Sequence, residues 1–186
     1  MADKQFKNTQ IIRKDAKSSF VETKSDCFRI DKVALNFVAY DATKPEGKRA
    51  TSSVSVHIPI DDLLLIAARI LSGELARTID EKRAKSDMKP IYQHLGGKNP
   101  EKAQRPDKMA LSRNVSLTVG RSALFFTAEE GPGEVSGTGI IAPKYKTPDN
   151  RVSVSISYDD FVKLILTTQA HYNAWLSVKY AKELYE

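Results

Sequence analysis

Two stretches of the chain resemble each other, and this internal similarity constrains the fold more than any other feature. The segments VSVHIPIDD at 54–62 and VSVSISYDD at 152–160 are identical at six of nine positions. Upstream, residues 30–41 align without a gap with residues 119–130. Two matched blocks in the same order indicate a duplicated unit, and the alternative is a chance similarity between amphipathic strands. The identical upstream pairs are Ala34/Ala123, Leu35/Leu124, Phe37/Phe126 and Ala39/Ala128.

The first copy has the pattern of strands followed by a helix. Apolar and polar residues alternate over 33–40 and 53–58, which predicts two half-buried strands. The turn between them contains Pro and Gly and suits a hairpin. Asp61 and Asp62 then precede an apolar run with helical spacing, and we expect them to cap that helix. The helix could extend to Ala84, with a kink or a loosened turn at Gly73.

The second copy has the same organisation. Alternation predicts strands over 117–119, 124–128 and 152–156, and a helix that starts at Asp159-Asp160 and continues to the C-terminus. We expect residues 131–150 to form a long flexible loop, with a short strand possible at Ile140-Ile141. Additional leading strands at 8–14, 20–30 and 109–119 would complete four strands and a helix in each copy. The expected fold class is therefore α+β, with two tandem antiparallel ββββα repeats and the helices packed on one sheet face.

These copies suggest a division of the chain into four parts that form one compact domain. Residues 1–19 form an N-terminal arm, 20–84 the first repeat, 85–112 a basic linker rich in Pro and Gly, and 113–186 the second repeat. Residues 82–113 include nine basic and three acidic residues. The net charge of this segment, +6, equals that of the whole chain. A basic segment of this kind permits binding of a polyanion.

Several classes of protein are excluded. Cys27 is the only cysteine, so no disulfide forms within the chain, and zinc-finger and iron–sulfur chemistry are excluded with it. The longest apolar run, 63–68, is far shorter than the roughly 20 residues of a membrane span. The polar N-terminus lacks the apolar core of a signal peptide. We expect a cytoplasmic protein, bacterial, phage-encoded or nucleoid-associated, that is not secreted and does not contact a membrane.

No catalytic constellation is visible in the sequence. The three histidines, His57, His94 and His171, have no metal-ligand spacing to one another. The glycines around Gly131-Pro-Gly133 are not followed by the Lys-Ser or Lys-Thr of a phosphate loop. We therefore expect no enzyme, no metal and no cofactor. A site in the 131–150 loop is the remaining enzymatic alternative.

The second face of the predicted strands carries the features of a binding surface. Three of the identical pairs share one face, which we assign to the core: Leu35/Leu124, Phe37/Phe126 and Ala39/Ala128. The opposite face is polar, with isolated aromatic residues and with cations at its edges. Aromatic rings stack on any base and cations neutralise phosphates, so this pattern favours single-stranded nucleic acid, although an ordinary solvated surface is the alternative. The predicted contact residues are Lys32, Asn36, Tyr40, Lys48, Arg49, His57, Arg121, Phe125, Lys144, Tyr145, Lys146 and Arg151.

Two tandem strand-and-helix units carrying VSVHIPIDD/VSVSISYDD and ALNF/ALFF resemble the Whirly and PUR-alpha type of single-stranded nucleic-acid-binding proteins. The resemblance covers residues 20–186 at the level of topology. The sequence contains neither the KGKALL-like strand motif of Whirly proteins nor the glycine- and arginine-rich signatures of PUR-alpha repeats. The resemblance implies a pseudo-dimer with a curved sheet that binds single strands, and a helix pair that joins the copies. By position, it assigns base contacts to Asn36, Tyr40, His57 and Phe125 and phosphate contacts to the edge cations.

We therefore expect a non-enzymatic protein that binds single-stranded DNA, or RNA as the less favoured ligand, with low sequence specificity. Surplus apolar residues on the predicted helices indicate a homo-oligomer, a dimer or a tetramer. The alternative is a protein–protein scaffold module that assembles through the same helices and a free sheet face.

Overall fold

The computed structural model describes residues 9–185. Residues 1–8 of the predicted N-terminal arm, which include the first residue of the strand predicted at 8–14, lie outside this range. The described chain contains two antiparallel sheets and four α-helices, so the α+β class is confirmed.

Sheet A is built from the first four strands in chain order, β1 (Gln10–Asp15), β2 (Ser19–Lys24), β3 (Lys32–Tyr40) and β4 (Ala50–Pro59). The strands predicted at 33–40 and 53–58 are confirmed. The extended segment expected at 20–30 ends early, because a short 3-10 helix, η1 (Phe28–Ile30), turns the chain between β2 and β3. Asp31 ends η1 in the left-handed conformation, with φ of 53°.

Two helices follow β4 where one was expected. α1 (Ile60–Leu71) and α2 (Glu74–Ala84) are separated at Gly73, which has a left-handed φ of 74°. Glycine adopts this conformation without the steric cost that a side chain imposes, and it commonly ends helices. The helix predicted to extend to Ala84 is therefore broken at Gly73, and the kink expected there is a complete interruption.

Sheet B contains the remaining strands, β5 (Tyr92–Lys98), β6 (Ala110–Val119), β7 (Leu124–Val135), β8 (Ile141–Pro143) and β9 (Asn150–Ile156). Their order is β5-β6-β7-β8, with β9 paired to the first half of β7. The expectation of a flexible loop over 131–150 is wrong at 131–135, which belong to β7, whereas the short strand expected at Ile140-Ile141 is present as β8, shifted by one residue. Pro132 and Gly133 continue the pairing of β7 with β6, and the end of β7 then pairs with β8.

The segment 85–112 contains β5, a short helix α3 (Pro100–Ala103) and the start of β6. β5 was not predicted, because its sequence YQHLGGK has no β-branched residue and two glycines, which weakens any strand signal. Pairing with β6 along its whole length supplies the stability that local propensity lacks.

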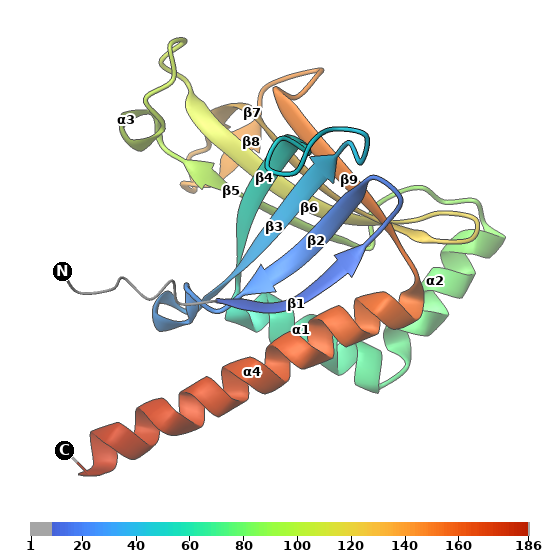
Figure 1. Ribbon diagram of the computed structural model, residues 1–186, viewed down its shortest axis with the longest axis vertical. Coiled ribbons are helices and arrows are strands. Elements are labelled where there is room, and N and C mark those ends of the chain that lie inside the picture. Colours follow the sequence, from blue (N-terminus) through green and yellow to red (C-terminus); the bar gives the residue numbers. More distant parts are fainter. Residues whose placement is uncertain (1–8, 186) are drawn as a thin grey trace.

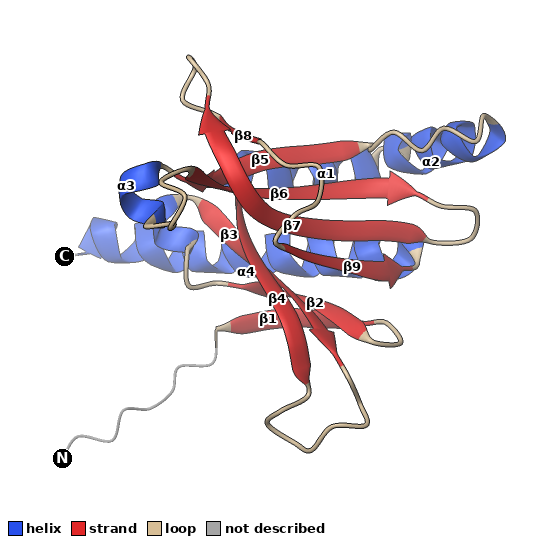
Figure 2. Cartoon of the chain, turned by 90° about the horizontal axis from the view of Figure 1, so that it is seen from above, coloured by secondary structure: helices blue, strands red, loops and turns tan. Residues whose placement is uncertain are grey.

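The two sheets pack face to face and cross at a steep angle (Figures 1 and 2). β4 contacts β5, β6, β7 and β9, and β9 contacts all four strands of sheet A, as in orthogonal packing. The rings of Phe37 and Phe126 meet between the sheets at 4.9 Å. The core predicted from the identical residues is confirmed at Leu35, Phe37, Leu124, Phe126 and Ala128, which are all buried.

Helices cover the rest of this core. α4 (Tyr158–Tyr185) packs against α1 and against β1 and β2, and its C-terminal part extends beyond the sheets (Figure 1). The inner faces of the sheets are therefore shielded partly by helices and partly by each other, where helices alone were expected. Among residues 9–185, no helix combines the length and the apolar character that crossing a membrane requires.

The paired aspartates do not cap their helices through their side chains as expected. Asp61 and Asp62 lie in the first turn of α1, where a negative charge suits the helix dipole, but no side chain caps this helix. Asp62 Oδ2 instead accepts the Tyr92 hydroxyl at 2.8 Å. At α4, the Ser157 hydroxyl accepts the backbone N–H of Asp160, and the Asp160 carboxylate accepts the Ser157 hydroxyl. The cap of α4 is therefore Ser157, with Asp160 as its partner.

The Asp62–Tyr92 bond ties α1 to sheet B, and we expect it to contribute to stability. Asp61→Ala and Asp62→Ala each remove one carboxylate from the same helical turn, but only the second removes the acceptor for Tyr92. A hydrogen bond to a charged group contributes about 1.5–3 kcal/mol. Urea denaturation should show that Asp62→Ala loses more unfolding free energy than Asp61→Ala by about this amount. Equal losses would mean that the link contributes nothing beyond the helix dipole.

Candidate nucleic-acid interface

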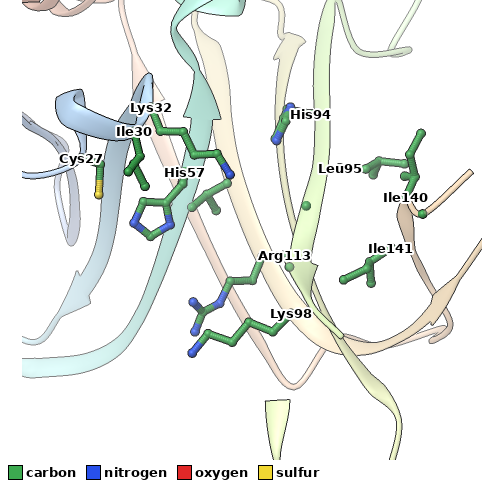
Figure 3. A pocket seen from close by; sticks show the side chains of 14 residues that line it. Cys27, Ile30, Lys32, His57, His94, Leu95, Lys98, Arg113, Ile140 and Ile141 are labelled. Carbon is green, nitrogen blue, oxygen red and sulfur yellow. The ribbon is translucent and has the colours of Figure 1, made fainter. Parts of the chain in front are cut away.

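A groove of about 460 Å³ opens where the two sheets diverge, between β4 and β5. One wall comes from Cys27 in the turn after β2, from η1, and from residues of β3 and β4. The other comes from β5, β6 and the turn before β8 (Figure 3). Both sheets are needed to form it. Its lining residues are Cys27, Ile30, Lys32, Val56, His57, His94, Leu95, Gly96, Gly97, Lys98, Arg113, Gly139, Ile140 and Ile141.

Three cationic side chains gather in this groove. Lys32 projects from one wall, and Lys98 and Arg113 project from the other toward the space below His57 (Figure 3). Within the described part of the chain, Lys32 and Lys98 make no ion pair. Arg113 donates through Nε to Glu130 Oε2 at 2.6 Å, which leaves its terminal nitrogens available. This concentration of positive charge favours an anionic ligand.

The floor of the groove is formed by backbone without side chains. Gly97 has a φ of 144°, and a Cβ at this residue would lie 1.9 Å from the Leu111 carbonyl oxygen, so only glycine fits. Gly96 pairs with Arg113 across the strands and leaves the space beside His94 open. Isoleucines at the rim, Ile30 and Ile140, are at least half exposed. A flat ligand can therefore approach the backbone between apolar side chains.

Two histidines face the groove from opposite walls. Burial lowers the pKa of His57, and the nearby guanidinium of Arg113 lowers it further. Burial also lowers the pKa of His94, although Asp62 Oδ2 lies 3.3 Å from its Nδ1 and opposes the shift. Both imidazoles are therefore neutral at pH 7, and they present flat rings that carry no charge.

Four of the predicted contact residues share one surface, the outer face of sheet A. Register places Lys32, Asn36 and His57 on this face, where Ala34 pairs with His57 and Asn36 with Ser55. The Tyr40 ring lies 6.2 Å from Phe20. The face leads from Tyr40 toward the groove.

Polar contacts on this face hold several of its side chains in place. The Asn36 amide donates to Glu22 at 3.1 Å and accepts the Ser55 hydroxyl. The Tyr40 hydroxyl donates to the Ala16 carbonyl oxygen at 3.1 Å. Asn36 is therefore engaged within the protein, while the Tyr40 ring remains half-exposed.

The other predicted contact residues are not brought to the groove. Phe125 and Arg151 lie on the outer face of sheet B, which points away from sheet A because the inner faces meet. Arg121 lies in the turn between β6 and β7, and Lys48 and Arg49 precede β4 in the turn after β3. The structure thus divides the predicted surface into several regions, of which the sheet A region joins the groove.

The segment between β8 and β9 holds the remaining three predicted residues. The Tyr145 ring covers Gly131, and its hydroxyl donates to Asn114 Oδ1 at 3.1 Å. Burial and the Glu129 carboxylate raise the pKa of Tyr145 to about 12. Lys144 pairs with Glu134 at 3.1 Å, and Lys146 is exposed. Tyr145 therefore packs against sheet B and is not a free stacking ring between two cations.

The sequence analysis missed the residues that complete the groove, which are His94, Lys98, Arg113 and the pair Gly96-Gly97. All of them come from β5 and β6, within the basic segment 82–113. The excess of positive charge in that segment was the available signal. Because β5 was not recognised as a strand, the sequence did not show which of these residues share a face.

The His57 pKa offers a direct test of the groove electrostatics. We expect Arg113→Gln to raise the His57 pKa toward its ordinary value of 6.5, because it removes a positive charge that disfavours the imidazolium. A proton NMR titration of the imidazole resonances measures this shift. The matched control, Arg151→Gln on the outer face of sheet B, should leave the His57 pKa unchanged. A His57 pKa that is the same in both variants would contradict the convergence of Arg113 and His57.

Comparison with known proteins adds no functional assignment to this geometry. No protein-family model matches the chain, and no curated protein sequence matches it. Within residues 9–185, no group of three or more His, Cys, Asp or Glu side chains is arranged to hold a metal ion. What the groove can do is therefore argued from its cations, its neutral rings and its open backbone floor.

Proposed function

We propose that the protein binds single-stranded nucleic acid, with the groove between β4 and β5 as its central contact. The observation that carries this proposal is the convergence of Lys32, Lys98 and Arg113 above a backbone floor at Gly96-Gly97. The cations would neutralise successive phosphates, with release of counterions. Neutral histidine rings and exposed isoleucines would contact the flat faces of bases, which all bases share. This mode of binding is non-enzymatic and tolerant of sequence.

The outer face of sheet A extends this surface beyond the groove. A strand that leaves the groove past His57 would cross Ser55 and Asn36 and reach the half-exposed ring of Tyr40. Phe20 lies beside Tyr40, and the Arg13 guanidinium sits 3.5 Å above the Phe20 ring. We propose single-stranded DNA as the ligand. RNA is the second ligand to be tested, because no side chain described here selects for or against a 2′-hydroxyl.

Internal duplication would explain why the two halves of the chain are built from similar elements. The inner faces of the two sheets carry matching residues, which are Leu35 and Phe37 on β3 and Leu124 and Phe126 on β7. β4 and β9 are each followed by a helix that has two aspartates in its first turn. This arrangement supports the proposed pair of tandem repeats and the pseudo-dimer of the Whirly and PUR-alpha type.

Apolar residues on α1 favour a second role in assembly. Leu65 and Leu71 are exposed by 61% and 70%, and Leu64 is also exposed, although all three lie on a helix that packs on the core. We propose that this face joins copies of the chain into a homo-oligomer, either alongside nucleic-acid binding or as the main activity of a scaffold module. Light scattering after size exclusion separates these cases when the same preparation is tested for nucleic-acid binding.

Removal of a groove cation should weaken binding and reduce its dependence on salt. Lys98→Ala removes one phosphate contact, so the slope of log affinity against log salt should fall by about 0.7 for a single strand. Fluorescence anisotropy with a labelled thymine oligonucleotide of about 30 residues measures both quantities, with the RNA equivalent and a duplex as further ligands. Arg151→Ala, on the far face of sheet B, should bind like the unchanged protein.

The single cysteine provides an independent check of location. Cys27 lines the groove, so a bound strand should slow its alkylation by a maleimide. Unchanged affinity in Lys98→Ala, together with unprotected Cys27, would remove the groove from the binding site. Tight binding without protection of Cys27 would place the ligand on another surface.

Glu130 should limit the affinity of the groove for single strands, because its carboxylate pairs with Arg113 and places a negative charge at the groove edge. Glu130→Gln keeps an acceptor for Arg113 but removes that charge. We expect single strands to bind roughly threefold to tenfold more tightly, which corresponds to about 0.7–1.4 kcal/mol. Glu129→Gln is the matched control, since Glu129 pairs with Arg151 on the outer face of sheet B. Equal affinities of the two variants would argue against phosphate binding by Arg113.

A further inference from the structure

A second hollow lies at the opposite end of β6 from the groove, and we call it the α2 pocket. Its volume is about 350 Å³, and it lies between the end of α2 and the turn that joins β6 to β7. It shares no lining residue with the groove. Its lining residues are Lys82, Arg83, Ser86, Met88, Val119, Gly120 and Arg121.

The α2 pocket combines apolar and cationic side chains. Met88 is 61% exposed, and it borders the pocket together with the buried side chain of Val119. Arg121 is exposed and makes no ion pair within residues 9–185. Lys85 and Lys89 are exposed in the same turn, next to the pocket residues in sequence. An apolar site with a positive rim is therefore open to solvent.

Local contacts hold this pocket in shape. Arg83 donates through Nε to the Gly120 carbonyl oxygen at 3.3 Å, which links α2 to the β6–β7 turn. Lys82 pairs with Asp87 at 2.7 Å, and Asp87 also accepts the Lys89 backbone N–H at 2.9 Å. The exposed Met88 is thus carried by a turn with fixed ends, and little ordering is needed when a ligand binds.

The lining chemistry distinguishes this pocket from the groove. No aromatic or histidine ring lines the α2 pocket itself, and the nearest ring, that of Phe125, lies beside Gly120 outside the hollow, so the hollow itself offers no surface on which bases stack. A hollow bordered by methionine and valine suits one apolar side chain, and methionine adapts to varied shapes. The positive charges of Arg121 and of the neighbouring lysines favour a ligand that carries carboxylates. A peptide supplies both features, and a nucleic acid supplies only the charge.

We propose that the α2 pocket binds an acidic peptide segment of a partner protein. One apolar side chain of the peptide enters between Met88 and Val119, and flanking carboxylates pair with Arg121 and with the exposed lysines of the same turn. Seven residues of β6 and its turn separate Arg113 from Gly120, or about 23 Å of extended chain. This exceeds the Debye length of about 8 Å at physiological salt, so the peptide and a single strand bind independently.

A labelled peptide tests this proposal directly. The probe is a fluorescein-labelled peptide in which four aspartates flank one leucine, and its binding to the full chain is measured by anisotropy. We expect saturable binding that weakens at least about fivefold in Arg121→Glu and in Met88→Glu. Replacing the leucine of the probe by glycine should have a similar effect. Arg151→Glu makes the same charge change on another surface and should leave the affinity unchanged.

Competition with a thymine oligonucleotide separates this proposal from the proposed function. An oligonucleotide in excess should not displace the peptide, and Arg121→Glu should bind the oligonucleotide normally. Equal binding of the leucine and glycine probes, or equal effects of Arg121→Glu and Arg151→Glu, would overturn the pocket as a peptide site. Displacement by the oligonucleotide, with loss of both ligands in Arg121→Glu, would show that the pocket takes nucleic acid instead. Thermal unfolding of each variant confirms that it is folded.

Discussion

The crossing of the two sheets at Phe37 and Phe126 determines where this protein has a core and where its groove opens. The rings meet edge to face at 4.9 Å, and Phe126 also packs against Phe161 of α4. Sheets that cross steeply touch around their crossing point and diverge beyond it. The inner face of sheet B is therefore covered at Leu117 but open at Arg113, four residues along the same strand. One strand face thus supplies both core side chains and side chains that line the groove.

Asp62 connects this packing to the site. Its carboxylate lies in the first turn of α1, where it accepts the Tyr92 hydroxyl and faces His94. Both partners belong to β5, the edge strand that carries Gly96, Gly97 and Lys98. The strand has weak intrinsic propensity, so it depends on β6 on one side and on Asp62 at its beginning. A residue that the sequence suggests as a helix cap therefore positions one wall of the groove.

Alternation and helical spacing were enough to predict β3, β4, β9, α1 and the core residues Leu35 and Phe126, because each signal is local. The groove could not be predicted in this way. Arg113 lies on the same strand face as the buried Leu117, whereas a polar residue is ordinarily assigned to the solvent side. Phe125 and His57 look equivalent as outward strand residues, but their sheets face opposite directions. Only the crossing of the sheets distinguishes these two residues, and that crossing depends on contacts between residues far apart in the sequence.

The basic segment 82–113 is therefore not one patch of charge. β5 and β6 carry Lys98 and Arg113 to one end of sheet B, while Lys82 and Arg83 remain at the other end beside Arg121. Charges separated by more than a Debye length act as independent sites in physiological salt. In the proposed binding mode, the salt dependence of single-strand binding then reflects the cations along the bound strand and not the net charge of +6. A short strand inside a basic segment thus separates its cations into two sites, for which we propose ligands of different chemistry.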